Sequence, residues 1–437
     1  MKHEVFTYLD EHKEELAKFL SQIVQIPSLN EGVEDSCDER QMSNFLTKYY
    51  QEMGLETKVV AVDKESKRPN VFGIYKGIGD GENILFNAHM DTVPITDADA
   101  WKYPPLSGKI VDGKVHGRGA SDCKQGIAAM TYAVKALQAA GVKLNGDVIL
   151  LASAGEESNE GGVYGAGPAI KEAGIKASFA IVGEGTNMEI DVESSSLCFF
   201  EVVVKGKSIH ASSRNQVVFP QSASVPCGSQ VGVDALAKAL PIINMLYAKE
   251  RDWNLNTMRS KIVGAGGSPY HDKAGVGAFT INPCDITGGT YLGSLIGEVR
   301  IKYSIWHDNT ISLEEIKKEI VRDIAAVAST DSWLRENPPI VNMPILQTWK
   351  GFHTDRNIEG VKILESAYKE LTGRDAIITG MKAVCDATYI NEQGIPSVVF
   401  GPGGMENGVH GTDEFCYVDS LVEAAKIYAS MIMKWCK

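Results

Sequence analysis

The chain has 437 residues, with 43 lysines and arginines against 56 aspartates and glutamates, and a formal net charge of -13. This length favours two domains over a single core, and the negative charge disfavours nucleic acid and anionic membranes as partners. No run approaches the roughly eighteen apolar residues of a membrane span, and the start lacks the apolar core of a signal peptide, so we expect a cytoplasmic protein.

The first two hundred residues alternate between helical and strand patterns of apolar residues. These patterns predict, in chain order, helices over 6–24 and 39–53, strands over 56–62, 70–75 and 84–87, a helix over 126–140, and strands over 147–152 and 179–182. We expect the strands at 70–75 and 84–87 to form a hairpin-like pair. The glycine-rich loop between them, 77–81, lacks the following helix that a nucleotide-binding loop requires, so we interpret it as a turn.

The character of the chain changes near residue 197. The predicted elements from there on are strands over 199–204, 278–281, 296–306 and 338–345, helices over 233–249 and 312–327, a glycine-rich connection over 264–277, and then a helix over 359–371, a strand over 397–400 and a closing helix over 418–435. We therefore predict an α/β fold. A mostly parallel sheet flanked by helices forms one domain, 1–196 with 347–437, and a smaller α+β domain, 197–346, is inserted into it.

Polar side chains that can bind metal follow three of the predicted strands. In chain order they are His89 and Asp91 after the first, Glu156 and Glu157 after the second, and Glu184 after the third. Alternate side chains of an extended segment share a face, so His89 and Asp91 point the same way. A lone pair of this kind would indicate only a strand edge, and adjacent glutamates only a solvated loop. Three such strand ends in succession favour a site, because α/β proteins place their chemistry there.

Asp122, in a glycine-flanked turn, and His410, in a glycine-rich segment, extend this set. Imidazole and carboxylate ligands suit zinc, cobalt or manganese. We expect two ions, because a carboxylate such as Asp122 can bridge a pair about 3.5 to 4 Å apart, the spacing at which both polarise a substrate and activate one water. One acidic residue should stay off the metals to take the proton of that water. Glu156, next to Glu157, is the candidate.

Five ordered motifs resemble the di-zinc amidohydrolases that include acetylornithine deacetylase, succinyl-diaminopimelate desuccinylase, aminoacylase and carboxypeptidase G. The motifs are HMDTVP at 89–94, GRGASDCKQG at 117–126, the pair Glu156-Glu157, GEGT at 183–186 and GVHGTDEF at 408–415. The resemblance covers nearly the whole chain. It implies the following roles: His89 and Glu184 on one metal, Glu157 and His410 on the other, Asp122 bridging both, Asp91 orienting His89, and Glu156 as general base.

The resemblance also implies that the inserted domain is a lid that carries a homodimer contact. The segment GKSIHASS at 206–213 is similar to the family's lid histidine motif, in which His210 would reach the partner's site and help stabilise the tetrahedral oxyanion. We interpret the other histidines, at positions 3, 12, 116, 271, 307 and 353, as surface residues. Asp386 matches a family segment near the substrate, but an ordinary turn aspartate explains it nearly as well.

Two positions depart from the family's pattern. Members that bind a substrate carboxylate commonly have a basic residue where this chain reads Ser194-Ser195-Ser196, and a further family arginine falls on Tyr303 or Ser304. GEGT also replaces GEPT. Two possibilities therefore stay open: a substrate without the usual α-carboxylate, or one bound by other cations such as Lys207, Arg214 or Arg300.

The resemblance implies a zinc-dependent amide hydrolase that removes an acyl group from an N-acyl amino acid or a related amine. A dipeptidase or carboxypeptidase of the same family, acting on short peptides, is the nearest alternative; a glutamate at position 184 is typical of the deacylases and carboxypeptidases and not of the aminopeptidases. An alternative from another class is a non-catalytic binding protein on the same fold, although such a protein has no need to keep every ligand and Glu156. An oxidoreductase would require nicotinamide binding, which we expect to be absent.

Overall fold

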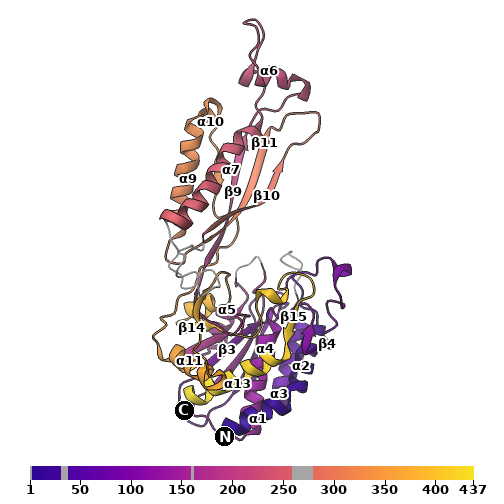
Figure 1. Cartoon of the computed structure of the whole chain (residues 1–437), viewed down its shortest axis with the longest axis vertical. Helices are drawn as coiled ribbons and strands as arrows, with labels where there is room; N and C mark the ends of the chain where they lie inside the picture. The colour runs from indigo at the N-terminus through magenta and orange to yellow at the C-terminus, as the bar shows by residue number, and fades with distance from the viewer. Residues whose placement is uncertain (1, 31–37, 159–161, 258–278) are drawn as a thin grey trace. The chain divides into compact units, whose positions relative to one another are not determined.

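The computed structural model describes residues 2–30, 38–158, 162–257 and 279–437. The chain divides into two compact units: unit 1, Met1–Ser194 with Phe352–Lys437, and unit 2, Ser195–Gly351 (Figure 1). The glycine-rich connection at 264–277 and His271 lie outside the described residues. Among the helices of the described chain, none has the length and apolar character needed to cross a membrane.

An eight-stranded sheet in the order β1-β2-β6-β3-β7-β14-β8-β13 forms the centre of unit 1. Its strands are β1 Glu56–Ala61, β2 Pro69–Tyr75, β3 Ile84–His89, β6 Val148–Ser153, β7 Phe179–Val182, β8 Ile190–Ser194, β13 Ile378–Met381 and β14 Ser397–Val399. β3 pairs in parallel with both β6 and β7, and β14 continues in parallel from β7. Every residue of β3, β6 and β7 is buried, which explains their continuous apolar sequences.

Helices cover both faces of this sheet (Figure 1). On one face lie α1 Lys2–Glu11, α2 Lys13–Gln25, α3 Arg40–Glu52, α4 Lys124–Ala139, α11 Glu359–Thr372 and α13 Val418–Trp435, and on the other lie α5 Ala166–Ala173 and α12 Ala387–Glu392. Within β3, Ile84 and Phe86 join the first core and Leu85 joins the second, as the two-residue period of a strand requires. The predicted α/β fold with a mostly parallel, helix-flanked sheet is confirmed.

Two predicted details of the first hundred residues are wrong. The helix expected over 6–24 is two helices that meet at His12, whose Nδ1 lies 2.8 Å from the Tyr8 carbonyl oxygen. The strands β2 and β3 do not form a hairpin, because β6 lies between them, antiparallel to β2 and parallel to β3. A strand that is buried on all six residues needs neighbours on both sides, and only a place inside the sheet provides them.

A three-stranded antiparallel sheet in the order β15-β5-β4 was not predicted. It consists of β4 Lys109–Val111, β5 Lys114–His116 and β15 Phe415–Tyr417. Three residues are too few to show a strand period in the sequence. In this sheet Phe415 pairs with His116, so the segment that precedes Asp122 lies beside the segment that follows His410.

Unit 2 contains a four-stranded antiparallel sheet in the order β10-β11-β9-β12. Its elements are β9 Ser196–Lys205, α6 Arg214–Val218, α7 Ala235–Asp252, β10 Thr280–Gly288, β11 Glu298–His307, α9 Leu313–Ser329, α10 Ser332–Glu336 and β12 Ile340–Asn342. Helices α7 and α9 share a core with alternate residues of β9 and β11, including Phe200 stacked on Tyr303 with ring centroids 4.8 Å apart. His307 was expected at the surface but is only 5% exposed. It is the last residue of β11, and its Nδ1 lies 2.9 Å from the carbonyl oxygen of Asp308.

Candidate metal centre

The carboxyl ends of β3, β6 and β7 meet at one edge of the sheet in unit 1. His89 is the last residue of β3, the pair Glu156-Glu157 follows β6, and Glu184 follows β7. Because these strands are parallel neighbours in the order β6-β3-β7, the residues after them converge. Asp122, in the turn before α4, and His410, in the loop before β15, complete the group.

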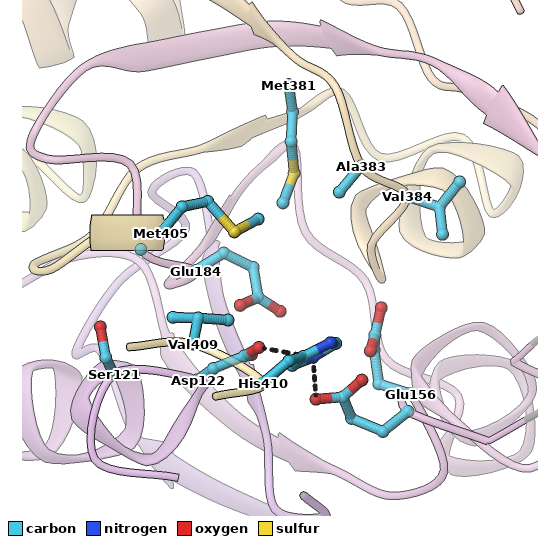
Figure 2. A pocket seen from close by; sticks show the side chains of 12 residues that line it. Ser121, Asp122, Glu156, Glu184, Met381, Ala383, Val384, Met405, Val409 and His410 are labelled. Carbon is cyan, nitrogen blue, oxygen red and sulfur yellow. Dashed lines mark hydrogen bonds and ion pairs between the residues drawn. The ribbon is translucent and has the colours of Figure 1, made fainter. Parts of the chain in front are cut away.

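Asp122 lies between the two histidines. Its Oδ1 is 3.1 Å from His89 Nε2, and its Oδ2 is 3.1 Å from His410 Nε2. Glu184 Oε1 is 3.2 Å from His89 Nε2, and Glu157 Oε1 is 3.1 Å from His410 Nε2. The structure thus groups His89 with Glu184 and His410 with Glu157, and Asp122 belongs to both groups. Figure 2 shows Asp122 and His410 of the second group.

These residues fit a pair of metal ions. Zinc binds nitrogen and oxygen ligands at about 2.0 to 2.2 Å, which places two ligands of one tetrahedral ion about 3.3 Å apart, close to the 3.1 to 3.2 Å separations found here. The cluster is also rich in negative charge. Burial, and next the charge of Asp122, raise the pKa of Glu157 to about 7. Divalent cations would neutralise this excess.

The carboxylates in turn favour protonated histidines. Burial lowers the pKa of His89, but the charge of Glu184 and the hydrogen bond with Asp122 help to outweigh burial, and the pKa lies well above the ordinary value. Hydrogen bonds with Asp122 and Glu157 raise the pKa of His410 to about 10. Since a histidine nitrogen must be unprotonated to bind a metal, metal binding has to displace these protons.

Asp91 supports the cluster from behind. Its backbone carbonyl oxygen is 2.9 Å from His89 Nδ1, whereas its carboxylate oxygen Oδ1 is 3.7 Å from the same nitrogen. The carboxylate accepts hydrogen bonds from the backbone N–H groups of Glu156, at 3.1 Å, and Glu157, at 2.9 Å. Asp91 therefore holds the ring of His89 mainly through its backbone, and its carboxylate fixes the turn that carries both glutamates.

The carboxylate of Glu156 lies beside the two ligand groups. Its Oε2 is 3.9 Å from His89 Nε2, a longer separation than those of Asp122 and Glu184. Burial raises the pKa of Glu156 well above its ordinary value, and the charge of Glu157 adds to the effect. A carboxyl group with a raised pKa at the edge of a metal cluster is suited to accept and return a proton.

Glu414 is a supporting residue to which the sequence assigned no role. Its carboxylate accepts hydrogen bonds from the backbone N–H groups of Gly119, at 3.0 Å, Ser121, at 2.8 Å, and Asp122, at 3.0 Å, and from Arg118 Nη1, at 2.7 Å. This one carboxylate orders the turn that carries Asp122. Glu414 and all four of its partners stand inside motifs already identified, so an acidic residue four positions after His410 was the available signal.

His210 belongs to the other unit, whereas Asp386 lies close to the cluster in unit 1, because its partner Ser153 pairs with His89 in the sheet. His210 belongs to unit 2, where it is exposed at the N-terminus of the short 3-10 helix Ala211–Ser213, with Nδ1 2.8 Å from the hydroxyl of Ser212. Asp386 is buried at the start of α12 and accepts a hydrogen bond from the Ser153 hydroxyl. Burial raises the pKa of Asp386 to about 6.

A cavity of ≈ 190 Å³ in unit 1 opens over the cluster (Figure 2). Its lining combines Asp122, Glu156, Glu157, Glu184 and His410 with the apolar side chains of Met381, Ala383, Val384, Met405 and Val409. The arrangement can hold two cations next to an unligated carboxyl group, at the mouth of a space large enough for a small organic molecule.

The chain is similar to several known proteins over nearly its whole length. Residues 85–434 match the model of the family described as peptidase family M20/M25/M40. The chain is 27% identical to the N-formyl-4-amino-5-aminomethyl-2-methylpyrimidine deformylase of Halalkalibacterium halodurans, over 99% of this chain and 97% of that one. It is 25% identical to the succinyl-diaminopimelate desuccinylase of Ehrlichia canis, over 96% and 97%. The solved structure of the Bacillus subtilis YXEP protein, described as a dinuclear metal binding peptidase from the M20 family, matches with a TM-score of 0.60 and 16% identity over 98% of this chain and 99% of that one.

Proposed function

The chain belongs to peptidase family M20/M25/M40, and from this premise we propose that it is a zinc-dependent amide hydrolase that removes a small acyl group from an amine. The observation that carries the proposal is the position of Asp122, whose two oxygens each lie 3.1 Å from a histidine nitrogen, with Glu156 left beside the ligand groups. The relatives named as a deformylase and a desuccinylase support an acyl-removing reaction.

We assign the ligands by their grouping. His89 and Glu184 would hold one ion, Glu157 and His410 the other, and Asp122 both. Zinc is the proposed metal, with cobalt or manganese as alternatives, because the ligands are imidazoles and carboxylates. When bound, such a pair supplies polarisation of the substrate carbonyl and a more acidic water.

Glu156 carries the proton through the reaction. As the water oxygen bonds to the carbonyl carbon, a proton passes from that water to the Glu156 carboxylate. The C–N bond then breaks, and the same proton moves from Glu156 to the leaving nitrogen, which gives a carboxylic acid and an amine. Asp91 keeps Glu156 in place through the backbone hydrogen bond of 3.1 Å.

Unit 2 would serve as lid and dimerisation domain. It covers the inserted domain predicted at 197–346 and contains His210, which we propose reaches the partner's site in a homodimer and stabilises the oxyanion of the tetrahedral intermediate. The exposed position of His210 is compatible with such a role.

The second candidate is a peptidase that acts on dipeptides or C-terminal residues. The likeness to the YXEP protein, which is described as a peptidase, supports this candidate. Zinc-loaded protein assayed on N-formyl, N-acetyl and N-succinyl amines and on dipeptides separates the two. Faster hydrolysis of the acyl amines supports the deacylase, and faster hydrolysis of dipeptides replaces it with the peptidase. Stoichiometric zinc without turnover of any amide would point to a non-catalytic binding protein.

A further inference from the structure

The wall of the cavity above the metal cluster is apolar. Met381 at the end of β13, Met405 in the short 3-10 helix Met405–Asn407, and Ala383, Val384 and Val409 line it. Figure 2 shows the side chains of Met381 and Met405 directed toward each other above Glu184. None of the described residues that line this cavity is a lysine or an arginine. A substrate group in this space therefore meets methyl groups and thioethers.

Lys207, Arg214 and Arg300 were named above as cations that could bind a substrate carboxylate. Each already has a hydrogen-bond or ion-pair partner inside unit 2. Arg300 Nε is 2.8 Å from Glu298 Oε1, and its Nη1 is 3.4 Å from Glu201 Oε2. Arg214 Nη1 is 2.6 Å from Asp234 Oδ2. Lys207 Nζ donates to the carbonyl oxygen of Gln230 at 2.6 Å. All three cations therefore belong to unit 2 and have partners there, and none of them lines the cavity.

The positions where the family pattern has basic residues offer no cation either. Ser194 and Ser195 are buried, at 0% and 1% exposure. Tyr303 is 1% exposed because its ring stacks on Phe200 inside the core of unit 2. A substrate carboxylate that enters this cavity away from the metal cluster would lose its hydrating water and gain no charged partner. Its burial would therefore cost free energy.

We propose that the substrate is the uncharged acyl derivative of an amine that bears an aromatic ring and no carboxylate, and not of an α-amino acid, with Met381 and Met405 as the contacts of the ring. This inference rests on the acyl-amine hydrolase proposed above. Methionine adapts its shape and makes favourable sulfur contacts with aromatic rings. The cavity of ≈ 190 Å³ also suits one ring, since a cavity of about 150 Å³ accepts benzene.

Three formamides that share one ring test the proposal: N-formylbenzylamine, N-formylphenylalaninamide and N-formylphenylalanine. The last two differ only in one group, which is a neutral carboxamide in the first and a charged carboxylate in the second. We expect kcat/KM of the zinc-loaded protein to be at least about tenfold higher for both uncharged compounds, because an unpaired desolvated charge costs at least the 1.4 kcal/mol that equals a factor of ten. A preference for N-formylphenylalanine would overturn the proposal.

Substitutions at the two methionines identify the contact. Met405 is 64% exposed, so Met405→Lys should fold and retain its zinc. We expect it to raise KM for N-formylbenzylamine and to shift the preference in kcat/KM about tenfold toward N-formylphenylalanine. Met405→Leu is the matched control and should keep the wild-type preference. If Met405→Lys and Met381→Lys both leave the preference unchanged, the methionines do not contact the ring.

Binding of the formamides separates failure of this proposal from failure of the hydrolase proposal. Calorimetry of the three formamides with the zinc-loaded Glu156→Gln variant needs no turnover. If no amide is hydrolysed by the wild-type protein but N-formylbenzylamine and N-formylphenylalaninamide still bind more tightly than N-formylphenylalanine, the reaction is wrong and the preference for aromatic amides without a carboxylate stands. If amides are hydrolysed but N-formylphenylalanine binds best, the hydrolase stands and the substrate class is wrong.

Discussion

The carboxylate of Glu414 accepts a hydrogen bond of 3.0 Å from the backbone N–H of Asp122, 292 positions earlier in the chain. The same carboxylate pairs with Arg118 at 2.7 Å, and both side chains are 1% exposed. The turn that carries the proposed bridging ligand is therefore fixed by Glu414, the residue directly before β15, the last strand of the unit. The integrity of the metal centre should depend on this buried pair.

Glu414→Ala should destabilise the protein and weaken metal binding. Removal of one partner from a buried ion pair leaves the other charge uncompensated and costs about 3 to 5 kcal/mol. Urea unfolding measures the loss, and zinc content measures the effect on the site. Glu370→Ala is the control, because the partly exposed pairs of Glu370 with Lys2 and Lys434 contribute about 1 kcal/mol or less. Equal stability of the two variants would contradict the role given to Glu414.

Glu156→Gln should abolish turnover and leave the metal content near two zinc ions per chain. The amide keeps the size of the side chain but cannot accept the proton of the attacking water, and loss of such a group lowers kcat by about 10² to 10⁴-fold. Kinetic assays test the loss of turnover, and metal analysis of the same preparation tests the retention of zinc. The adjacent Glu157→Gln should instead lose zinc. Full activity of Glu156→Gln would remove Glu156 from its proposed role.

Zinc binding should release protons at about pH 8. The pKa of His410 is raised to about 10 by Asp122 and Glu157, so without metal the ring carries a proton at this pH, and zinc must displace it. Below a pH of about 10, apparent affinity should rise about tenfold per pH unit for each proton released. Calorimetry in buffers of different ionisation enthalpy counts the protons, and His410→Asn should release fewer. Affinity that does not change between pH 7 and 9 would refute this prediction.

The core of the site followed from the sequence because three buried strands have continuous apolar sequences. β3, β6 and β7 could each be recognised from their own residues, and parallel neighbours bring His89, Glu157 and Glu184 to one edge. The order of the strands could not be recognised in this way. It is a tertiary property, and the hairpin expected for β2 and β3 failed because β6 lies between them.

Other parts of the site gave no local signal. Met381 ends the four-residue strand β13 and Met405 begins a three-residue 3-10 helix, and elements this short show no period that would mark either side chain as the wall of a cavity. Glu414 stands directly before β15, a strand of only three residues, and its partners include backbone N–H groups 292 to 295 positions away. Contacts of this kind depend on the final packing and not on any pattern within the segment.

Gly126→Ala should destabilise unit 1, although the same change stabilises an ordinary helix. Gly126 lies in the first turn of α4, behind the metal cluster. A Cβ atom there would meet the Gly183 carbonyl oxygen at 2.5 Å and the Ala88 Cβ at 2.8 Å, and both belong to the strand ends that carry Glu184 and His89. Alanine in a helix interior normally adds about 0.5 to 1 kcal/mol over glycine.

The steric clash lowers the melting temperature and the gain in helix propensity raises it. The direction in which Gly126→Ala changes the melting temperature therefore tells which effect is larger, without a further control. If α4 has to move away from β3 and β7 to make room, the melting temperature should fall and zinc should bind more weakly, because the residues after these strands hold the proposed ligands. Differential scanning calorimetry of the metal-free and zinc-loaded variant measures both. A rise in melting temperature for Gly126→Ala would show that helix propensity prevails, and that the close approach of α4 to the strand ends does not hold the metal centre together.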